Sequence, residues 1–83
     1  MDLRGRSAIV TGGAGGLGAA TVRELASAGM GVVVFDRDAD GARALAEELG
    51  ASTTAVGGDV NDDADVALAI DAAQALGPLS VVV

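Results

Sequence analysis

The stretch Ile9–Gly18 reads IVTGGAGGLG, and five of its last seven residues are glycine. Ordering this much glycine costs backbone entropy, so the chain must gain something from it. Residues 7–11 (SAIVT) are apolar without strict alternation, which predicts a short buried strand before the glycines. Small and apolar residues then recur at helical spacing, which predicts a helix that begins near Gly18 and ends at Gly29. This order of strand, turn and helix lets backbone N–H groups face a phosphate.

The alternation of strand and helix continues along the rest of the sequence. Further strands are predicted at residues 31–35, 52–56 and 79–83, and further helices at 39–49 and 62–76. Asp38 and Asn61 are the predicted caps of these two helices, and Asp62, Asp63 and Asp65 follow in the first turn of the second, where the helix dipole favours anions. Short connections between alternating elements predict an α/β fold, a doubly wound parallel sheet of the Rossmann type with strand order 3-2-1-4.

Composition limits the functions that a single domain of 83 residues can carry. Twelve acidic residues against five arginines give a net charge of −7, and an acidic chain without a basic stripe is a poor partner for nucleic acid. The absence of cysteine excludes disulfides and thiolate metal sites and fits a reducing compartment, so we expect a cytoplasmic protein. We expect no membrane partner, because no apolar run approaches the roughly 18 residues of a transmembrane helix.

The glycine turn fits the general dinucleotide fingerprint G-x-G-x-x-G at Gly13, Gly15 and Gly18. A flexible connector is the alternative explanation of a glycine-rich stretch. The context favours a nucleotide site, because a predicted strand precedes the turn, a predicted helix follows it, and Asp36 ends the second strand.

Asp36 lies 18 positions after Gly18, near the roughly 20 expected of the carboxylate that accepts hydrogen bonds from the adenosine ribose hydroxyls. The alternative is an aspartate that only caps the end of a strand. Arg37 could meet the 2′-phosphate of NADP, but the carboxylate of Asp36 would repel the same phosphate. The sequence therefore favours NAD over NADP as the cofactor.

The glycines also fit a second register, T-G-x-x-x-G-x-G, which falls on Thr11, Gly12, Gly16 and Gly18. With an acidic residue after the second strand and Asp59-Val60 after the third, this register resembles the N-terminal part of the short-chain dehydrogenases/reductases. The resemblance extends over all 83 residues. It implies that Asp59 contacts the adenine amino group, that the Val60 backbone lies on the ring edge, and that Leu17 lies near the nicotinamide.

The resemblance implies more chemistry than this sequence contains. In the family, an Asn-Ala-Gly turn follows the fourth strand, and a catalytic serine and a Tyr-x-x-x-Lys pair come later. This sequence has no tyrosine and no lysine, and its serines have no histidine or lysine to activate them, so we predict no catalytic residue in it.

We therefore expect residues 1–83 to be an NAD-binding Rossmann domain, truncated at the fourth strand. The whole enzyme would transfer hydride between NAD and a small alcohol or ketone substrate. The residue sequence of the glycine turn, together with Asp36, resembles that of family members that act on hydroxyacyl-CoA or hydroxysteroid substrates. For the full-length enzyme we expect a homo-oligomer.

Two other classes of protein compete with this interpretation. S-adenosylmethionine-dependent methyltransferases also carry a glycine-rich first turn and acidic residues after the second and third strands. They usually have an acidic residue just before the glycines, where this sequence has Val10 and Thr11. A non-catalytic nucleotide-binding module is the second alternative.

A calcium loop is another explanation for the aspartates after the third strand. Asp59, Asn61 and Asp63 stand at the 1, 3 and 5 spacing of such a loop. Ala64 and Ile70 occupy the positions that need glycine and glutamate, so helix capping explains these aspartates better, and no metal site is predicted.

Overall fold

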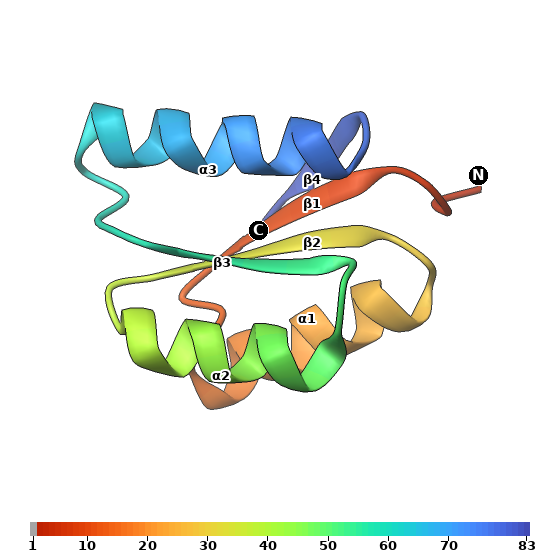
Figure 1. Ribbon diagram of the computed structural model, residues 1–83, viewed down its shortest axis with the longest axis horizontal. Coiled ribbons are helices and arrows are strands. Elements are labelled where there is room, and N and C mark those ends of the chain that lie inside the picture. Colours follow the sequence, from red (N-terminus) through yellow and green to blue (C-terminus); the bar gives the residue numbers. More distant parts are fainter. Residues whose placement is uncertain (1) are drawn as a thin grey trace.

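The computed structural model describes residues 2–83, in which four parallel strands alternate with three helices (Figure 1). The strands are β1 (Ser7–Thr11), β2 (Gly31–Asp36), β3 (Thr53–Gly57) and β4 (Leu79–Val82). The helices are α1 (Gly16–Ser27), α2 (Ala39–Leu49) and α3 (Asp63–Leu76). The strand order β3-β2-β1-β4 confirms the predicted doubly wound Rossmann topology.

The sheet is covered on both faces, by α1 and α2 on one side and by α3 on the other (Figure 1). Side chains of a strand point alternately to the two faces. Val32 and Val34 of β2 therefore pack in the core under α1 and α2, whereas Val33 and Phe35 pack in the core under α3. Burial on both faces explains why β2 is a continuous apolar run rather than an alternating one.

The helix caps agree with the sequence at α2 and differ from it at α3. Asp38 caps α2 and accepts a hydrogen bond from the Gly41 N–H at 2.9 Å, as predicted. The prediction that Asn61 caps α3 is wrong, because Asp62 is the cap and accepts from the second and third N–H groups after it. The reason is a tight turn before the helix, closed by the Asp62 N–H on the Asp59 carbonyl at 3.0 Å, which places Asn61 inside the turn.

Other boundaries move by one or two residues. Helix α1 begins at Gly16, two residues earlier than predicted, and the chain leaves it through Gly29 at φ +87°, a left-handed conformation that favours glycine. Strand β3 begins at Thr53 instead of Ser52, because the Thr53 N–H donates back to the Gly50 carbonyl in a turn. Within residues 2–83, no helix has the length and apolar character needed to cross a membrane.

Phe35 is the only aromatic residue of the sequence, and it is buried at the end of β2 in the core under α3. We expect Phe35→Ala to lower the free energy of unfolding by about 3–5 kcal/mol, through lost transfer energy and the cavity left behind. Urea denaturation followed by circular dichroism measures this loss. The control is Leu68→Ala on α3, where the side chain is 58% exposed and the expected change is about 0.5 kcal/mol or less. Equal losses in the two variants would contradict this assignment of the core.

Candidate functional site

The glycine turn, residues 12–15, connects the end of β1 to the start of α1. Gly12 has φ +65°, in the left-handed region that glycine adopts without steric cost. Its N–H donates to the Phe35 carbonyl at 2.8 Å, and its own carbonyl accepts from the Gly15 N–H at 3.2 Å. These bonds fix the turn against the end of β2.

The glycines of this stretch differ in what surrounds them. A Cβ on Gly13 would lie 2.9 Å from a valine side chain of β2, and a Cβ on Gly18 would overlap the Gly12 carbonyl oxygen. A Cβ on Gly15 would make only ordinary van der Waals contact, and one on Gly16 would meet nothing within 4 Å. The fold therefore requires glycine at positions 12, 13 and 18, while positions 15 and 16 are exposed and have room for a side chain.

The N-terminus of α1 differs from those of α2 and α3. Aspartate side chains cap α2 and α3, but within residues 2–83 no side chain caps α1 and its first turn holds no acidic residue. The free N–H groups and the helix dipole make this end of α1 favourable for an anion. Leu17, in the first turn of α1, is 86% exposed.

Asp36 lies at the end of β2, opposite the glycine turn. One carboxylate oxygen, Oδ2, accepts from the Ala14 N–H at 3.0 Å, and the other, Oδ1, accepts from the Asp38 N–H at 2.9 Å. The carboxylate is only partly buried. An ionised carboxylate has about four lone-pair sites, so two remain open toward a ligand.

Arg37 and Asp59 form an ion pair between the loops that follow β2 and β3, with Nη2 of Arg37 2.7 Å from Oδ2 of Asp59. The other oxygen of Asp59 accepts from the Asn61 N–H. This backbone hydrogen bond and the nearby guanidinium hold the pKa of Asp59 below its ordinary value, against the opposing effect of desolvation. Asp59 is therefore an anion at neutral pH and pairs with the exposed Arg37 guanidinium.

A cavity of about 230 Å³ lies at the carboxyl ends of β1, β2 and β3, the edge at which ligands bind in open α/β sheets. It is lined by Gly12, Phe35, Asp36, Arg37, Gly58 and Val60. Four of these six are predicted site residues, whereas Phe35 and Gly58 were not predicted. Both lie beside a predicted residue at a strand end, and the strand-end rule would have pointed to them.

Other predicted residues lie around this cavity rather than in its wall. Asp59 is turned toward Arg37, and Gly15, Gly16, Leu17 and Gly18 belong to the turn and the start of α1. Thr11 precedes the turn, and its hydroxyl donates to the Val83 carbonyl at 2.6 Å, which joins the end of β1 to the residue after β4.

The acidic loop before α3 does not form a metal centre among residues 2–83, where no group of three or more acidic side chains could hold an ion. Asp59 stands at the first position of the calcium-loop spacing. Its carboxylate faces the Arg37 guanidinium and the Asn61 N–H, both hydrogen-bond donors.

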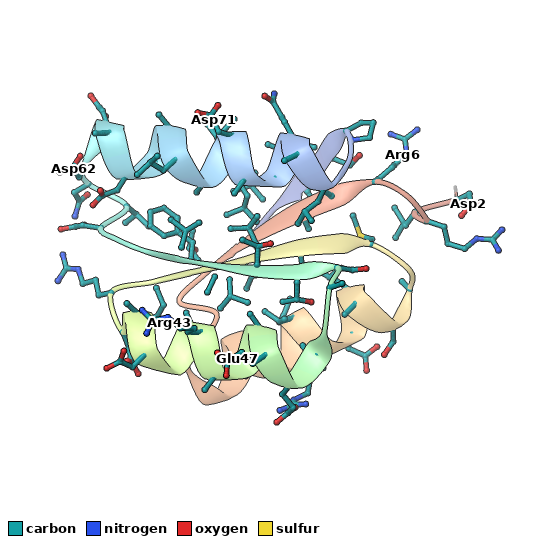
Figure 2. The ribbon with its side chains drawn as sticks, viewed as in Figure 1. Asp2, Arg6, Arg43, Glu47, Asp62 and Asp71 are labelled. Carbon is teal, nitrogen blue, oxygen red and sulfur yellow. The ribbon has the colours of Figure 1, made fainter. Side chains whose placement is uncertain are left out.

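A second hollow of about 460 Å³ lies between α2 and β3. Arg43 and Glu47 of α2 line it and are labelled in Figure 2. None of the predicted site residues lies in its wall, so the strand-end cavity is the candidate site.

The fold and this edge of the sheet define a dinucleotide-binding Rossmann domain: a glycine turn, an uncapped helix N-terminus and a carboxylate at the end of the second strand. The family described as short chain dehydrogenase matches residues 6–83. The chain belongs to this family, whose members are oxidoreductases that bind a nicotinamide dinucleotide.

Similar proteins agree with this membership. The "Probable oxidoreductase" of Streptomyces lividans is 46% identical over 85 residues, covering 100% of this chain and 29% of the relative. The crystal structure of 3-hydroxyacyl-CoA dehydrogenase type-2 from Mycobacterium avium has a TM-score of 0.92 at 50% identity and covers 94% of this chain and 31% of that chain. The crystal structure of 3-ketoacyl-(acyl-carrier-protein) reductase from Brucella melitensis complexed with NADH has a TM-score of 0.88 at 36% identity. It covers 96% of this chain and 33% of that chain. The chain thus spans no more than a third of the length of these proteins.

The different surroundings of the glycines can be tested by adding a methyl group at each. We expect Gly18→Ala to lower the free energy of unfolding by about 1–3 kcal/mol, because its Cβ would overlap backbone that cannot rotate away. Gly16→Ala should leave stability unchanged or raise it by about 0.5–1 kcal/mol, since its Cβ meets nothing and alanine favours a helix. Urea denaturation of both variants makes the comparison, and a stable Gly18→Ala would show that the turn and α1 are not in contact.

Proposed function

We propose that this chain supplies the N-terminal, dinucleotide-binding part of an NAD-dependent oxidoreductase that transfers hydride between NAD and a hydroxyl or carbonyl substrate. The observation that carries the proposal is the uncapped N-terminus of α1, which lies beside two exposed glycines and opposite the Asp36 carboxylate. Family membership supports it, and it sets aside the methyltransferase alternative.

The diphosphate of the cofactor would bind at the glycine turn and the first turn of α1. Free N–H groups there are donors for phosphate oxygens, and the helix dipole adds a favourable field. Gly15 and Gly16 leave the approach open, because the unliganded fold itself does not require glycine at either position. Leu17, exposed on the same turn, would lie toward the nicotinamide.

The adenosine ribose would bind at Asp36. Two lone-pair sites of this carboxylate remain after its bonds to Ala14 and Asp38, and a ribose of NAD has two hydroxyls to donate to them. In NADP a phosphate replaces one of these donors and brings negative charge toward Asp36. Arg37 would have to leave Asp59 to compensate that charge, so the pair favours NAD.

The adenine would enter the cavity between Arg37 and Val60, whose exposed side chains offer a planar cation and an aliphatic surface. Glycine at position 58 lets the loop after β3 pack closely, because a Cβ there would lie 2.8 Å from the Asp65 Cβ and 2.9 Å from the Phe35 ring. Asp59, at the rim of this space, is an acceptor for the adenine amino group.

When bound, the nicotinamide supplies hydride chemistry, and the residues of this chain hold and orient it. The proton that accompanies the hydride needs an acid or base, and this sequence offers neither tyrosine nor lysine for that task. The names of similar structures, 3-hydroxyacyl-CoA dehydrogenase and hydroxysteroid dehydrogenase, support a secondary alcohol or ketone as the substrate class. A cytoplasmic homo-oligomer remains our proposal for the whole enzyme.

A nucleotide-binding module without catalysis is the second candidate, since the candidate nucleotide site lies within residues 2–83. The two candidates share the binding site and differ in what the rest of the protein contributes. Reading the coding sequence after codon 83 separates them, since only the oxidoreductase needs a Tyr-x-x-x-Lys pair there.

We expect the 83-residue chain to bind NADH without catalysing oxidation or reduction. Acid–base assistance contributes about 10²–10⁴-fold to such reactions, and this sequence has no group to provide it. NADH fluorescence measures binding without interference, because the chain has no tryptophan or tyrosine. Turnover of secondary alcohols with NAD above a matched blank would contradict the expectation.

Gly16→Ala is the variant that tests where the diphosphate binds. Its methyl group would occupy the approach to the turn without disturbing the unliganded fold. The dissociation constant for NADH should rise by about fivefold or more, the equivalent of roughly 1 kcal/mol. Unchanged affinity in a folded Gly16→Ala would place the diphosphate elsewhere.

Cofactor preference tests the role of Asp36 directly. Two unit charges about 4 Å apart interact by about 4 kcal/mol at an effective dielectric near 20, and even a quarter of this gives NADH a preference of about fivefold over NADPH. In Asp36→Ala the ratio of the two dissociation constants should move toward NADPH by at least about that factor. Calorimetric titration of both cofactors measures the ratio, with Asp40→Ala as a control that removes an exposed carboxylate of α2. If the ratio is the same in all three proteins, Asp36 is only a strand-end cap.

A further inference from the structure

Asp36 makes contacts that no ribose requires. Its main-chain carbonyl accepts from the Gly58 N–H at 3.0 Å, and its carboxylate accepts from the N–H groups of Ala14 and Asp38. The loops that follow β1, β2 and β3 are thus all hydrogen-bonded to this one residue. The three loops form the rim of the candidate site.

The bond to Ala14 is the long-range contact that Asp36 makes with its side chain. It joins residues 22 positions apart and is partly shielded from solvent. Ala14 lies in the middle of the glycine turn, between left-handed Gly12 and the N-cap Gly15. Within residues 2–83, the other hydrogen bonds of the turn are backbone bonds at its two ends. The bond from the Ala14 N–H to the Asp36 carboxylate is therefore the one that ties the turn to a side chain.

A turn this rich in glycine needs such a restraint. Each glycine has more accessible backbone conformations than any other residue, and a site that must be ordered when the ligand arrives binds more weakly by the cost of ordering. A carboxylate can accept from two amides and still bind a ligand, whereas a carboxamide has one acceptor oxygen. The charge also strengthens both hydrogen bonds.

We propose that Asp36 is a positioning residue for the diphosphate as well as a contact for the ribose. It holds the Ala14 N–H and thereby keeps the glycine turn in the shape that presents its N–H groups to a diphosphate. This inference deepens the proposed function and rests on it. Its consequence is that ligands without ribose hydroxyls also depend on Asp36.

The first measurement needs no ligand. In the ¹⁵N-labelled chain, amide hydrogen exchange at Ala14 should quicken about tenfold in Asp36→Asn, because the carboxamide keeps one acceptor oxygen for two N–H groups. Asp40→Asn makes the same chemical change on the outside of α2 and should leave Ala14 as it is in the wild type. If Asp36→Asn does not give a dispersed spectrum, Asp36→Glu, which keeps the charge and displaces the carboxylate, should show the same faster exchange. Unchanged exchange at Ala14 in the folded variant overturns the inference.

The second measurement separates the diphosphate from the ribose. ADP has both ribose hydroxyls, and 2′,3′-dideoxy-ADP has the same base and diphosphate without them. At an ionic strength of about 0.15 M, where long-range charge effects are screened, Asp36→Asn should weaken the binding of both ligands, and that of dideoxy-ADP by about fivefold. Leu45→Ala, which removes a core side chain of α2, should lower stability and leave the dideoxy-ADP affinity of the folded protein unchanged.

The possible results distinguish failure of this inference from failure of the proposed function. If Asp36→Asn binds dideoxy-ADP as tightly as the wild type and loses affinity only for ADP, Asp36 acts on the ribose alone and the inference is overturned while the proposed function stands. If the folded wild-type chain binds neither ADP nor NADH, the proposed function fails and the inference fails with it.

Discussion

The close approach of α1 to the glycine turn is the constraint on which the rest of the site depends. Only because Gly18 has no side chain can the first turn of α1 lie against the Gly12 carbonyl. This contact places the N-terminus of α1 at the carboxyl edge of the sheet, beside the ends of β1 and β2. Had α1 packed farther out to accommodate a Cβ, its free N–H groups would lie farther from the edge that holds Asp36.

Charge compensation explains how so acidic a chain can present a site for an anion. Its net charge is −7, yet the carboxylates nearest the site are turned onto donors of the protein itself. Backbone N–H groups donate to Asp36, Asp38, Asp59, Asp62 and Asp65. These bonds spread the negative charge into the backbone and anchor the loops at the same time. The uncapped N-terminus of α1 is the place at this edge where donors are left for a ligand.

Local pattern was enough to predict the fold, because each strand and helix is specified by its own residues. The run Gly31–Phe35 is apolar at every position after its glycine, and such a run predicts a strand buried on both faces. The cap of α3 could not be read in the same way. Asn61 and Asp62 are both good caps, but Asn61 lies inside a turn that the Asp62 N–H closes on the Asp59 carbonyl, so Asp62 caps the helix. When two adjacent residues can each cap a helix, the sequence does not show which of them lies inside the turn before it.

The sequence predicted those residues of the candidate site that belong to a recognised motif and also lie at the end of a strand. Gly12, Asp36, Arg37 and Val60 line the cavity because each lies at or just beyond the end of a strand, and parallel strands end at one edge. The contact between Asp36 and Ala14 was not predictable, since 22 residues separate them and no spacing rule links a turn alanine to a distant carboxylate. Tertiary hydrogen bonds of this kind depend on how two loops face each other, which only the folded chain determines.

The two glycine registers that fit the turn also have a physical resolution. The register of Gly13 and Gly15 and that of Gly12 and Gly16 share Gly18. Besides Gly18, each contains one glycine that the fold requires and one that it does not. Gly12 and Gly13 are fixed by a left-handed φ and by close packing against β2, whereas Gly15 and Gly16 are exposed. A glycine that the unliganded fold does not need still costs backbone entropy, so its presence has to be explained by something outside the fold. The diphosphate of the proposed function would supply such an explanation, and it applies to the exposed glycine of either register.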